Sequence, residues 1–538
     1  MLFFVPLLYS QQVKESIITQ IPILEYKSEA YNFKFDPHSR NWLYFAYDTV
    51  IAKNVIISSW GTIATDAFVF VGNAFFDESG NIYYIVDKSK YESDRQEFSF
   101  MKNDQIVLTS YFIGDNWALR DGILYFQIID DGYSYLTTYN LKTGELKRSK
   151  PYYNIEFIYY KGTIAEEREA YGFPGFTKSG KVYYIASEEG KSFLVVGEKE
   201  YKKYSDIDRW NLVFDALENP VYIAKSKGSL YMEKGNTFLV HGDKEYKSFD
   251  YVISPVIGND NIPIYIGQDS IGEYRYRSHL MKGSKEIDVI DGDIANIKVS
   301  KDGKLSYVVT TERKIKADSS IFKSYLVYDD KKTQKYDYIF DYELHNGNLI
   351  MAVQIDNKSV LLSNGKAISD KYDNLSTFKF LDDNNLAYIA TNYGDYSLEL
   401  PDKNYVVIGN KTYGPYDGLT FANFDDSNSF VYANQDLYAF IKTRNTYDYQ
   451  STKFSVVSNK WVSEEFDYVD KLQIINGKVI YITSTGDFEE GNEKYSIYID
   501  NKFIAGGYDS VGESWVNGNK FSMVVSKGNT MYYIEIEL

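Results

Sequence analysis

The stretch Leu239–Ile266 reads LVHGDKEYKSFDYVISPVIGNDNIPIYI and decides the fold. Its short apolar runs are separated by the turn residues Gly242-Asp243 and Gly258-Asn259-Asp260. Runs of this length, bounded by Gly, Asn and Asp, are typical of β-strands that are joined by tight hairpins. The stretch therefore predicts a series of short antiparallel strands.

A similar sequence pattern recurs along the chain, in Val195–Tyr201 (VVGEKEY), Val407–Tyr413 (VIGNKTY) and Ile499–Lys502 (IDNK). A second recurring pattern is an apolar run, a polar turn and then a strand that is often rich in tyrosine. The turns of this kind are Asp36–Asn41, Asp77–Asn81, Thr177–Lys181, Ser300–Lys304, Leu381–Asn385 and Asn476–Lys478. The spacing is roughly 36 to 50 residues, which allows about twelve units.

Each unit offers four strands, and no amphipathic helix is evident between them. Four-stranded repeats of this length indicate β-propeller blades. We therefore predict an all-β fold of tandem β-propellers, built from about twelve four-stranded blades. A pair of β-sandwiches is the alternative architecture.

Propellers usually have four to eight blades, so about twelve units predict two rings. An even division gives residues 11–295 and residues 296–538, with about six blades each, and seven plus five is the other division considered. The last unit contains only three strands, around Trp515, Phe521–Val525 and Met531–Leu538. The lone strand predicted at Ile17–Tyr26 is the candidate for the missing fourth, which would close the last blade.

The turn Ser300-Lys-Asp-Gly-Lys304, followed by the apolar strand Leu305–Val309, resembles the TolB-like, WD40-like propeller repeat. The mark of that repeat is an Asp-Gly-Lys turn before an apolar strand, and the resemblance covers most of the chain. It implies a propeller fold. By analogy it also implies a periplasmic protein partner, such as an outer-membrane machine.

The net charge of −17 disfavours nucleic acid and anionic membranes as partners. The sequence has no cysteine, which excludes disulfides and zinc-thiolate sites. No run of 18 apolar residues occurs, so no transmembrane helix is expected. The 53 tyrosines suit pleated, half-buried strands, because the ring packs while the hydroxyl stays in water.

Residues 1–10, MLFFVPLLYS, resemble the end of a secretory signal peptide with cleavage after Ser10. No basic residue precedes the run, and Leu8 stands where a small residue is usual. A buried first strand is the alternative interpretation. We expect export, with a periplasmic or outer-membrane-associated location.

No compact catalytic or metal-binding pattern is present. The four histidines, His38, His241, His279 and His345, are far apart and are interpreted as solvated turn residues. No HExxH, GxSxG, P-loop or strand-associated GxGxxG motif occurs. We therefore predict no enzyme activity, no cofactor and no metal.

An aspartate recurs directly after an aromatic residue at the end of a unit. The positions are Asp250, Asp337, Asp373, Asp417, Asp467 and Asp509. One interpretation is an acidic ring that binds a cation or a basic partner. The favoured interpretation is structural, because a repeated residue usually serves the repeat, here by accepting backbone N–H bonds where one blade leads to the next.

The segment from residue 150 to residue 171 lengthens one unit and is the candidate binding loop. It carries Tyr152, Tyr153, Tyr159 and Tyr160, whose rings would suit protein contacts or carbohydrate stacking. A solvated spacer is the alternative.

The leading functional hypothesis is a non-enzymatic protein-binding or assembly module of the cell envelope. Its propeller loops and rims would face a protein partner, such as an outer-membrane complex. The alternative is a carbohydrate-binding or carbohydrate-active propeller with carboxylates in a central pocket. A surface-exposed adhesion domain is a third interpretation, which differs mainly in location.

Overall fold

The computed structural model describes most of the chain. The described residues are 13–20, 33–48, 53–65, 68–69, 74–87, 97–114, 116–157, 174–230, 233–272, 275–316, 319–381, 385–395, 400, 402–420, 430–434, 437–444, 452–486 and 492–538. Every regular element in these ranges is a β-strand, so the all-β prediction is confirmed.

The strands form twelve small antiparallel sheets, which we call blades 1 to 12 in chain order. Blade 1 consists of β2 (Phe33–Phe35), β3 (Trp42–Asp48), β4 (Lys53–Ser58) and β5 (Gly61–Thr65), and blade 2 of β6 (Phe68–Val69), β7 (Phe75–Phe76), β8 (Ile82–Asp87), β9 (Phe98–Lys102) and β10 (Gln105–Ser110). Blade 3 consists of β11 (Phe112–Ile113), β12 (Ala118–Arg120), β13 (Ile123–Asp130), β14 (Tyr133–Asn140) and β15 (Leu146–Arg148). Blade 4 consists of β16 (Asn154–Glu156), β17 (Gly175–Phe176), β18 (Val182–Glu188), β19 (Lys191–Val196) and β20 (Lys199–Glu200).

Blade 5 consists of β21 (Asp206–Ile207), β22 (Val213–Phe214), β23 (Pro220–Lys225), β24 (Thr237–His241) and β25 (Lys244–Glu245). Blade 6 consists of β26 (Tyr251–Ile257), β27 (Pro263–Gly272), β28 (Arg275–Lys282) and β29 (Lys285–Asp291), and blade 7 of β30 (Asp293–Val299), β31 (Leu305–Lys316), β32 (Ser319–Tyr328) and β33 (Lys331–Lys332). Blade 8 consists of β34 (Tyr338–His345), β35 (Asn348–Ile355), β36 (Lys358–Ser363) and β37 (Lys366–Ala367).

Blade 9 consists of β38 (Asn374–Phe380), β39 (Leu386–Asn392), β40 (Lys403–Ile408) and β41 (Lys411–Tyr416), and blade 10 of β42 (Gly418–Thr420), β43 (Phe430–Asn434), β44 (Leu437–Arg444) and β45 (Lys453–Ser458). Blade 11 consists of β46 (Tyr468–Ile475), β47 (Lys478–Thr485), β48 (Lys494–Ile499) and β49 (Lys502–Tyr508). Blade 12 consists of β50 (Ser510–Asn517), β51 (Lys520–Lys527), β52 (Thr530–Glu537) and, from the other end of the chain, β1 (Val13–Gln20).

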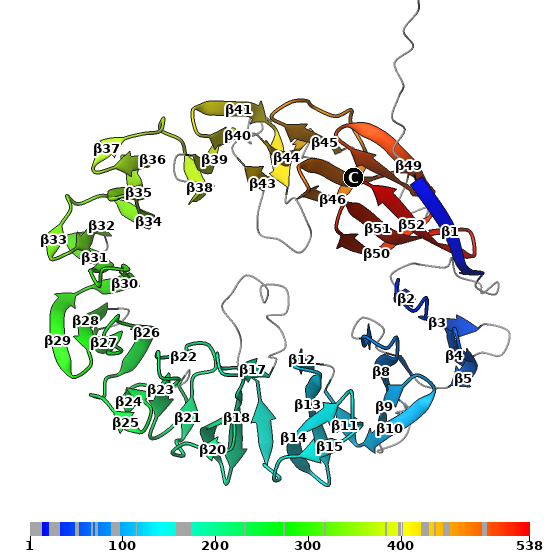
Figure 1. The fold of residues 1–538 in the computed structure, drawn as a ribbon. Helices are drawn as coiled ribbons and strands as arrows, with labels where there is room; N and C mark the ends of the chain where they lie inside the picture. Colours follow the sequence, from blue (N-terminus) through cyan, green and yellow to red (C-terminus); the bar gives the residue numbers. More distant parts are fainter. Residues whose placement is uncertain are drawn as a thin grey trace, which may run out of the picture.

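The blades follow one another around a single ring (Figure 1). The first strand of a blade lies on the inner side of the ring and the fourth on the outer side, as β26, β30, β34 and β38 show against β29, β33, β37 and β41. Radially arranged antiparallel sheets of this kind are β-propeller blades. The predicted propeller fold is therefore confirmed.

Five of the six predicted hairpin turns are formed between first and second strands as expected, and residues 382–384 of the sixth lie outside the described residues. The backbone N–H of Asp77 bonds to the carbonyl of Asn81, and Ser300 bonds in the same way to Lys304, each at 2.9 Å. Gly80 and Gly303, with φ of 78° and 82°, supply the left-handed conformation that these turns need. The Asp77 carboxylate also accepts the N–H groups of Ser79 and Asn81.

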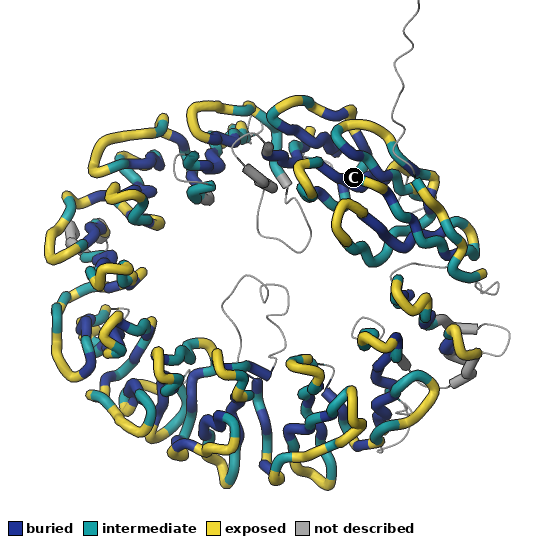
Figure 2. The backbone as a smooth tube through the Cα atoms, in the orientation of Figure 1, coloured by how far each residue is buried: buried dark blue, intermediate teal, exposed yellow. Residues whose placement is uncertain are grey.

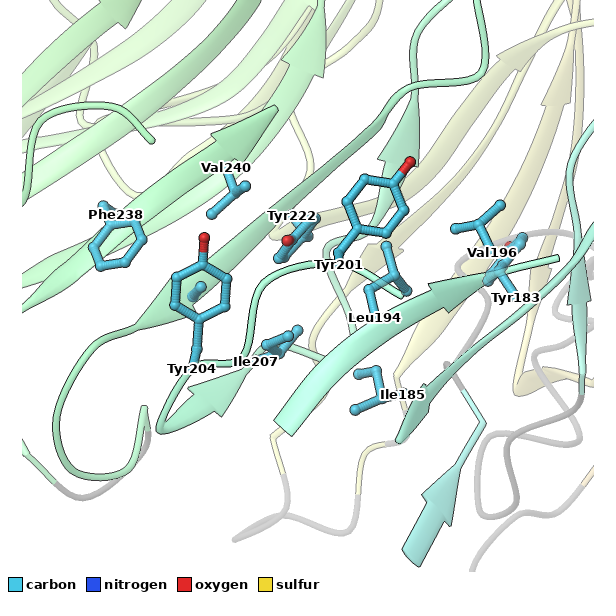
Figure 3. Close-up of a cluster of buried hydrophobic side chains, with 11 residues drawn as sticks. Tyr183, Ile185, Leu194, Val196, Tyr201, Tyr204, Ile207, Tyr222, Phe238 and Val240 are labelled. Carbon is cyan, nitrogen blue, oxygen red and sulfur yellow. The ribbon is translucent and has the colours of Figure 1, made fainter. Parts of the chain in front are cut away.

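A hydrophobic core separates each blade from the next. The core between blades 4 and 5 contains Tyr183, Leu194, Tyr201, Tyr204 and Tyr222 (Figure 3). In the described residues such a core occurs at each of the twelve blade junctions, including the junction of blade 12 with blade 1. Figure 2 shows the buried residues along the middle of the blades and the exposed residues mainly at the hairpins.

The ring is closed by strands from both ends of the chain. β1 pairs antiparallel with β52, from Val13 opposite Ile536 to Gln20 opposite Thr530, and becomes the fourth strand of blade 12. The predicted closure of the last blade is thus confirmed: the described strand includes residues 17–20 of the predicted Ile17–Tyr26, and residues 21–26 lie outside the described residues. Phe35 of blade 1 then packs against Trp515 and Tyr533 of blade 12.

The observed ring differs from the two rings expected from the sequence. Blade 6 packs on blade 7, and blade 12 packs on blade 1, so the described blades form one closed circle. The boundary drawn between residues 295 and 296 falls inside β30. Whether residues 11–295 and 296–538 fold as separate units stays a prediction.

The two faces of the ring differ in their connections. Antiparallel strands alternate in direction, so each crossing from a fourth strand to the next first strand lies on the same face as the hairpin between second and third strands. We call this the crossover face. The opposite face carries the turns between first and second and between third and fourth strands, and we call it the turn face.

Candidate functional site

The repeated aromatic–Asp step lies at the crossings between blades. The aromatic residue is buried and bridges the third strand of its own blade, as Tyr336 bridges Ser324 and Tyr372 bridges Ser359. The following aspartate begins the next blade. Its backbone N–H bonds to the second strand of that blade, as Asp373 does to the carbonyl of Thr391 at 3.0 Å.

Five of the six repeated carboxylates accept a backbone N–H from the end of the second strand of the next blade. The pairs are Asp250 with Ser270 (2.9 Å), Asp337 with Asp356 (2.7 Å), Asp373 with Tyr393 (3.0 Å), Asp467 with Gly486 (3.0 Å) and Asp509 with Gly528 (2.5 Å). These are the bonds that the structural interpretation of the repeat requires. Asp417 follows Tyr416 at the same step, and its carbonyl accepts a 3.0 Å bond from the Asn404 side chain.

Four of these aspartates also bind a lysine of the preceding blade, which stands just before the residue that pairs with the aromatic residue of the step. The pairs are Lys323 with Asp337, Lys358 with Asp373, Lys453 with Asp467 and Lys494 with Asp509. The Lys358 ammonium lies 2.6 Å from Asp373 Oδ1 and lowers the pKa of that carboxyl. Both oxygens of each carboxylate are therefore occupied within the fold, one by a lysine and one by a backbone N–H.

One crossing carries tyrosines where the others carry this pair. Between blades 3 and 4, Tyr152 is buried and bridges Ser134, as Tyr336 bridges Ser324. Tyr153 therefore stands at the aspartate position, and its N–H bonds to the Ser187 carbonyl at 3.0 Å. Tyr133 directly precedes Ser134, so it stands at the lysine position.

The structure separates the four tyrosines of the candidate binding loop. Tyr152 is 3% exposed, and its hydroxyl donates a 2.8 Å bond to Glu200, so it belongs to the core. Tyr153 is 73% exposed and is available for binding. Tyr159 and Tyr160 lie outside the described residues. Tyr133, which stands at the lysine position of this crossing, was missed by sequence reasoning because only the strand register aligns it with the lysines.

The preceding crossing, between blades 2 and 3, has a tyrosine as well. Ile113 pairs with Ile128 as Ile155 pairs with Ala186, which aligns Tyr111 with Tyr153. Tyr111 is exposed. Two successive crossings thus place a tyrosine where later crossings place an aspartate.

Exposed aromatic side chains gather on the crossover face. At its crossings, at adjoining inner-strand positions or in its hairpins lie Tyr111, Tyr133, Tyr153, Phe322, Tyr338, Phe340 and Tyr393. Tyr338 and Phe340 are neighbours, with ring centroids 5.1 Å apart. The other exposed aromatic residues in the described ranges are Trp60, Trp210 and Phe503.

The interpretation of the histidines as solvated turn residues is wrong for His241 and His279. His38 is exposed, but His279 is buried, with Nδ1 2.8 Å from Glu286 and its ring against Phe249. His241 Nε2 lies 2.9 Å from the buried Asp215 carboxylate. The reason is that His241 and His279 lie within strands β24 and β28, where each meets a carboxylate of its own blade.

No metal centre is found within the part of the chain that the structure describes, because no three His, Asp or Glu side chains there could hold an ion. Those residues also contain no helix that is long and apolar enough to cross a membrane. The propeller fold supplies no catalytic group by itself.

No protein-family model matches the chain, and no curated protein does. Among solved structures, the chain is similar to the β-propeller domain of the Trilobed protease from Pyrococcus furiosus, with 11% identity over 56% of this chain and 94% of that one and a TM-score of 0.25. It is also similar to the tricorn protease (10%, 94% and 51%, TM-score 0.22).

TolB from Acinetobacter baumannii is a further structural neighbour (12% identity, 54% of this chain and 74% of that one, TM-score 0.20). These neighbours are propeller-containing proteins, in line with the expected resemblance. At such identities and scores they carry no argument about function. The fold rests on the twelve blades themselves.

Proposed function

We propose that the protein is a non-enzymatic binding module that docks a protein partner on its crossover face. The observation that carries the proposal is the gathering of exposed tyrosine and phenylalanine rings on that face. Aromatic residues are enriched in protein interfaces because they bury much apolar area while losing few rotamers. The turn face has fewer exposed rings in the described ranges.

The state of the carboxylates supports a binding role over a catalytic one. A glycosidase needs two carboxylates that face one cleft, with a proton on one of them. Four of the repeated aspartates are instead engaged by a lysine and a backbone N–H group, and Asp250 accepts a backbone N–H. Their pKa values at Asp337, Asp373 and Asp467 are lowered, which favours permanently ionised groups.

Affinity capture from native cells tests the proposal. The full chain carries a tag, and partners are identified by mass spectrometry. The crossover-face variant replaces Tyr111, Tyr153, Tyr338, Phe340 and Tyr393 with serine. The turn-face control replaces Trp60, Leu217 and Phe503 with serine, which are likewise exposed.

We expect a partner that the wild type and the turn-face control capture and the crossover-face variant loses. Capture of the same partner by the crossover-face variant overturns the proposal. Recovery of the wild type alone, without any partner, also counts against it.

We also propose export to the cell envelope, with a periplasmic or outer-membrane-associated location and an outer-membrane complex as the partner. The support is the apolar run in residues 1–10 and the TolB-like turn wording. Fractionation of native cells tests this, and recovery of the protein with cytosolic markers contradicts it.

A further inference from the structure

The crossing between blades 3 and 4 keeps the backbone of the repeat and changes only its side chains. Ser134 and Tyr152 exchange two backbone bonds, at 2.8 and 3.0 Å, as Ser324 and Tyr336 do at 2.9 and 2.8 Å. The ion pair of the repeat is nevertheless replaced by Tyr133 and Tyr153. The change is therefore not caused by a different local fold.

The side chains of these two tyrosines, unlike their backbones, make no stabilising contact that the structure shows among the described residues. They are 49% and 73% exposed, and among the described residues neither ring packs on another ring and neither hydroxyl has a protein partner. A repeat position that serves the fold elsewhere thus presents two aromatic faces to solvent. A departure of this kind from a structural repeat points to binding.

Two exposed carboxylates flank the pair. Asp131 and Glu189, at the tips of the adjoining hairpins of blades 3 and 4, are exposed and have no basic partner among the described residues. Three cations of the same blades are engaged in ion pairs: Arg148 with Asp130 at 3.1 Å, Lys150 with Glu200 at 2.7 Å, and Lys203 with Glu188. Lys191 occupies the lysine position of the following crossing.

Tyrosine faces flanked by carboxylates attract cationic groups, since the π-electrons and the carboxylates act on the same charge. At four other crossings a lysine at this position pairs with the repeated aspartate, and Lys191 occupies the position at the crossing to blade 5. Here the chain supplies none, and the net charge of −17 steers basic partners toward the ring.

We propose that Tyr133, Tyr153, Asp131 and Glu189 form the binding site for a lysine- or arginine-bearing segment of a protein partner. The proposal rests on the proposed function and names the place on the crossover face and the chemistry of the partner. Tyr111, at the preceding crossing, extends the same surface.

The test uses the full chain and a fluorescein-labelled peptide, (Gly-Arg-Gly-Lys)4, as the probe, with fluorescence anisotropy at roughly physiological salt. The decisive variant is Y133K/Y153D, which restores the lysine–aspartate pair of the repeat and leaves the net charge unchanged. General attraction to a negative protein is therefore the same in both proteins. We expect the variant to bind the probe about tenfold more weakly than the wild type.

A second comparison separates the effect of the nearby carboxylates on probe binding from the effect of the overall net charge. D131N/E189Q and D329N/D330N remove the same charge, the latter from a turn on the turn face. We expect only D131N/E189Q to weaken binding strongly. Equal binding by Y133K/Y153D and wild type, or equal loss in both charge variants, overturns the inference. Thermal unfolding verifies that each variant folds, and Y133S/Y153S replaces Y133K/Y153D if that variant does not.

Failure here and failure of the proposed function are distinguishable. If the crossover-face serine variant loses its cellular partner but Y133K/Y153D binds the probe like the wild type, only this inference falls. If the serine variant keeps the partner, the proposed function falls.

Discussion

The Tyr508 hydroxyl donates a 2.5 Å hydrogen bond to Glu15, across 493 positions of sequence. Tyr508 ends blade 11 and is fully buried, while Glu15 lies in β1. Burial, and then the Glu15 carboxylate, raises the pKa of Tyr508, so the hydroxyl remains a donor at physiological pH. Lys527 also approaches Glu15, at 3.4 Å. The first strand is thus joined to the last two blades by specific polar contacts as well as by its ladder.

Ile18 and its neighbour Ile17 in β1 differ in how they pack. Ile18 packs against the core between blades 12 and 1, whereas Ile17 is 57% exposed. We expect Ile18→Asp to lower the free energy of unfolding by about 2–3 kcal/mol, because it places a carboxylate in an apolar core. The matched control Ile17→Asp should change it by less than about 0.5 kcal/mol. Urea unfolding measures both, and equal effects would show that β1 does not contribute through packing.

Gly267 is required by the aromatic residue of the preceding crossing. A Cβ at this position would lie 2.3 Å from the Phe249 ring. We therefore expect Gly267→Ala to destabilise the protein by about 1–3 kcal/mol, through overpacking. Gly272, in the same strand β27, has no neighbouring atom closer than 3.8 Å to such a Cβ, so Gly272→Ala is the control and should be nearly neutral. Thermal unfolding compares the two.

A second substitution distinguishes overpacking from a change in strand propensity. Phe249→Leu removes part of the ring that the new methyl group meets. Combined with Gly267→Ala, it should recover part of the lost stability. A double variant that is less stable than the sum of the single losses would argue against the clash.

The sequence predicts the local structure well because hairpin chemistry is local. The turn at Asp77–Asn81 and the step Tyr336-Asp337 were placed correctly from Gly, Asn and Asp positions alone. The number of rings was not predicted correctly from the sequence, because ring closure depends on the angle between packed blades. That angle is set by side chains such as Phe35, Trp515 and Tyr533, which are distant in sequence and have no repeat signature.

The candidate site was predicted in part for a related reason. Tyr153 was singled out from the tyrosine-rich segment, but its equivalence to Asp337 appears only once Tyr152 is paired with Ser134. A signal was available, since Tyr152-Tyr153 stands where other units have an aromatic residue followed by aspartate. Tyr133 carries no such signal, because the lysines that it replaces lie in strands of differing sequence.

The lysine–aspartate pairs make the stability of the ring depend on acidic pH. Lys323 and Lys358 lower the pKa values of Asp337 and Asp373; at Asp467, burial opposes the change, but Lys453 and the Gly486 N–H outweigh it. Folded values below the unfolded value of about 3.9 mean that these groups stabilise the fold above about pH 4. Their contribution is lost as pH falls through the folded pKa values.

The expected result is a urea midpoint that declines below about pH 4 in the wild type. In the triple variant D337N/D373N/D467N the decline should be shallower, since three of the responsible carboxyls are gone. The midpoint of the variant should also be lower at pH 6, with each exposed pair worth at most about 1 kcal/mol. Parallel curves for the two proteins would rule out a role for these pairs in the acid response.

The Tyr342 hydroxyl closes a backbone irregularity in the neighbouring blade. In β30 the pairing with β31 shifts between Ala295 and Lys298, and Asn296 has a φ of 52°. Such a bulge leaves a carbonyl outside the ladder. Tyr342, fully buried in blade 8, donates a 2.6 Å hydrogen bond to the Asn296 carbonyl.

Removing this hydroxyl should therefore cost more than removing one at the surface. We expect Tyr342→Phe to lower the free energy of unfolding by about 1–2 kcal/mol, because it removes a buried hydroxyl that bonds both the Asn296 carbonyl and the Ser306 Oγ. Tyr338→Phe, in the same strand β34 but exposed, is the matched control and should fall within about 0.5 kcal/mol of the wild type. Urea unfolding at neutral pH compares the three proteins. Equal stability of the two variants would mean that another group, such as a water molecule, satisfies the bulge carbonyl.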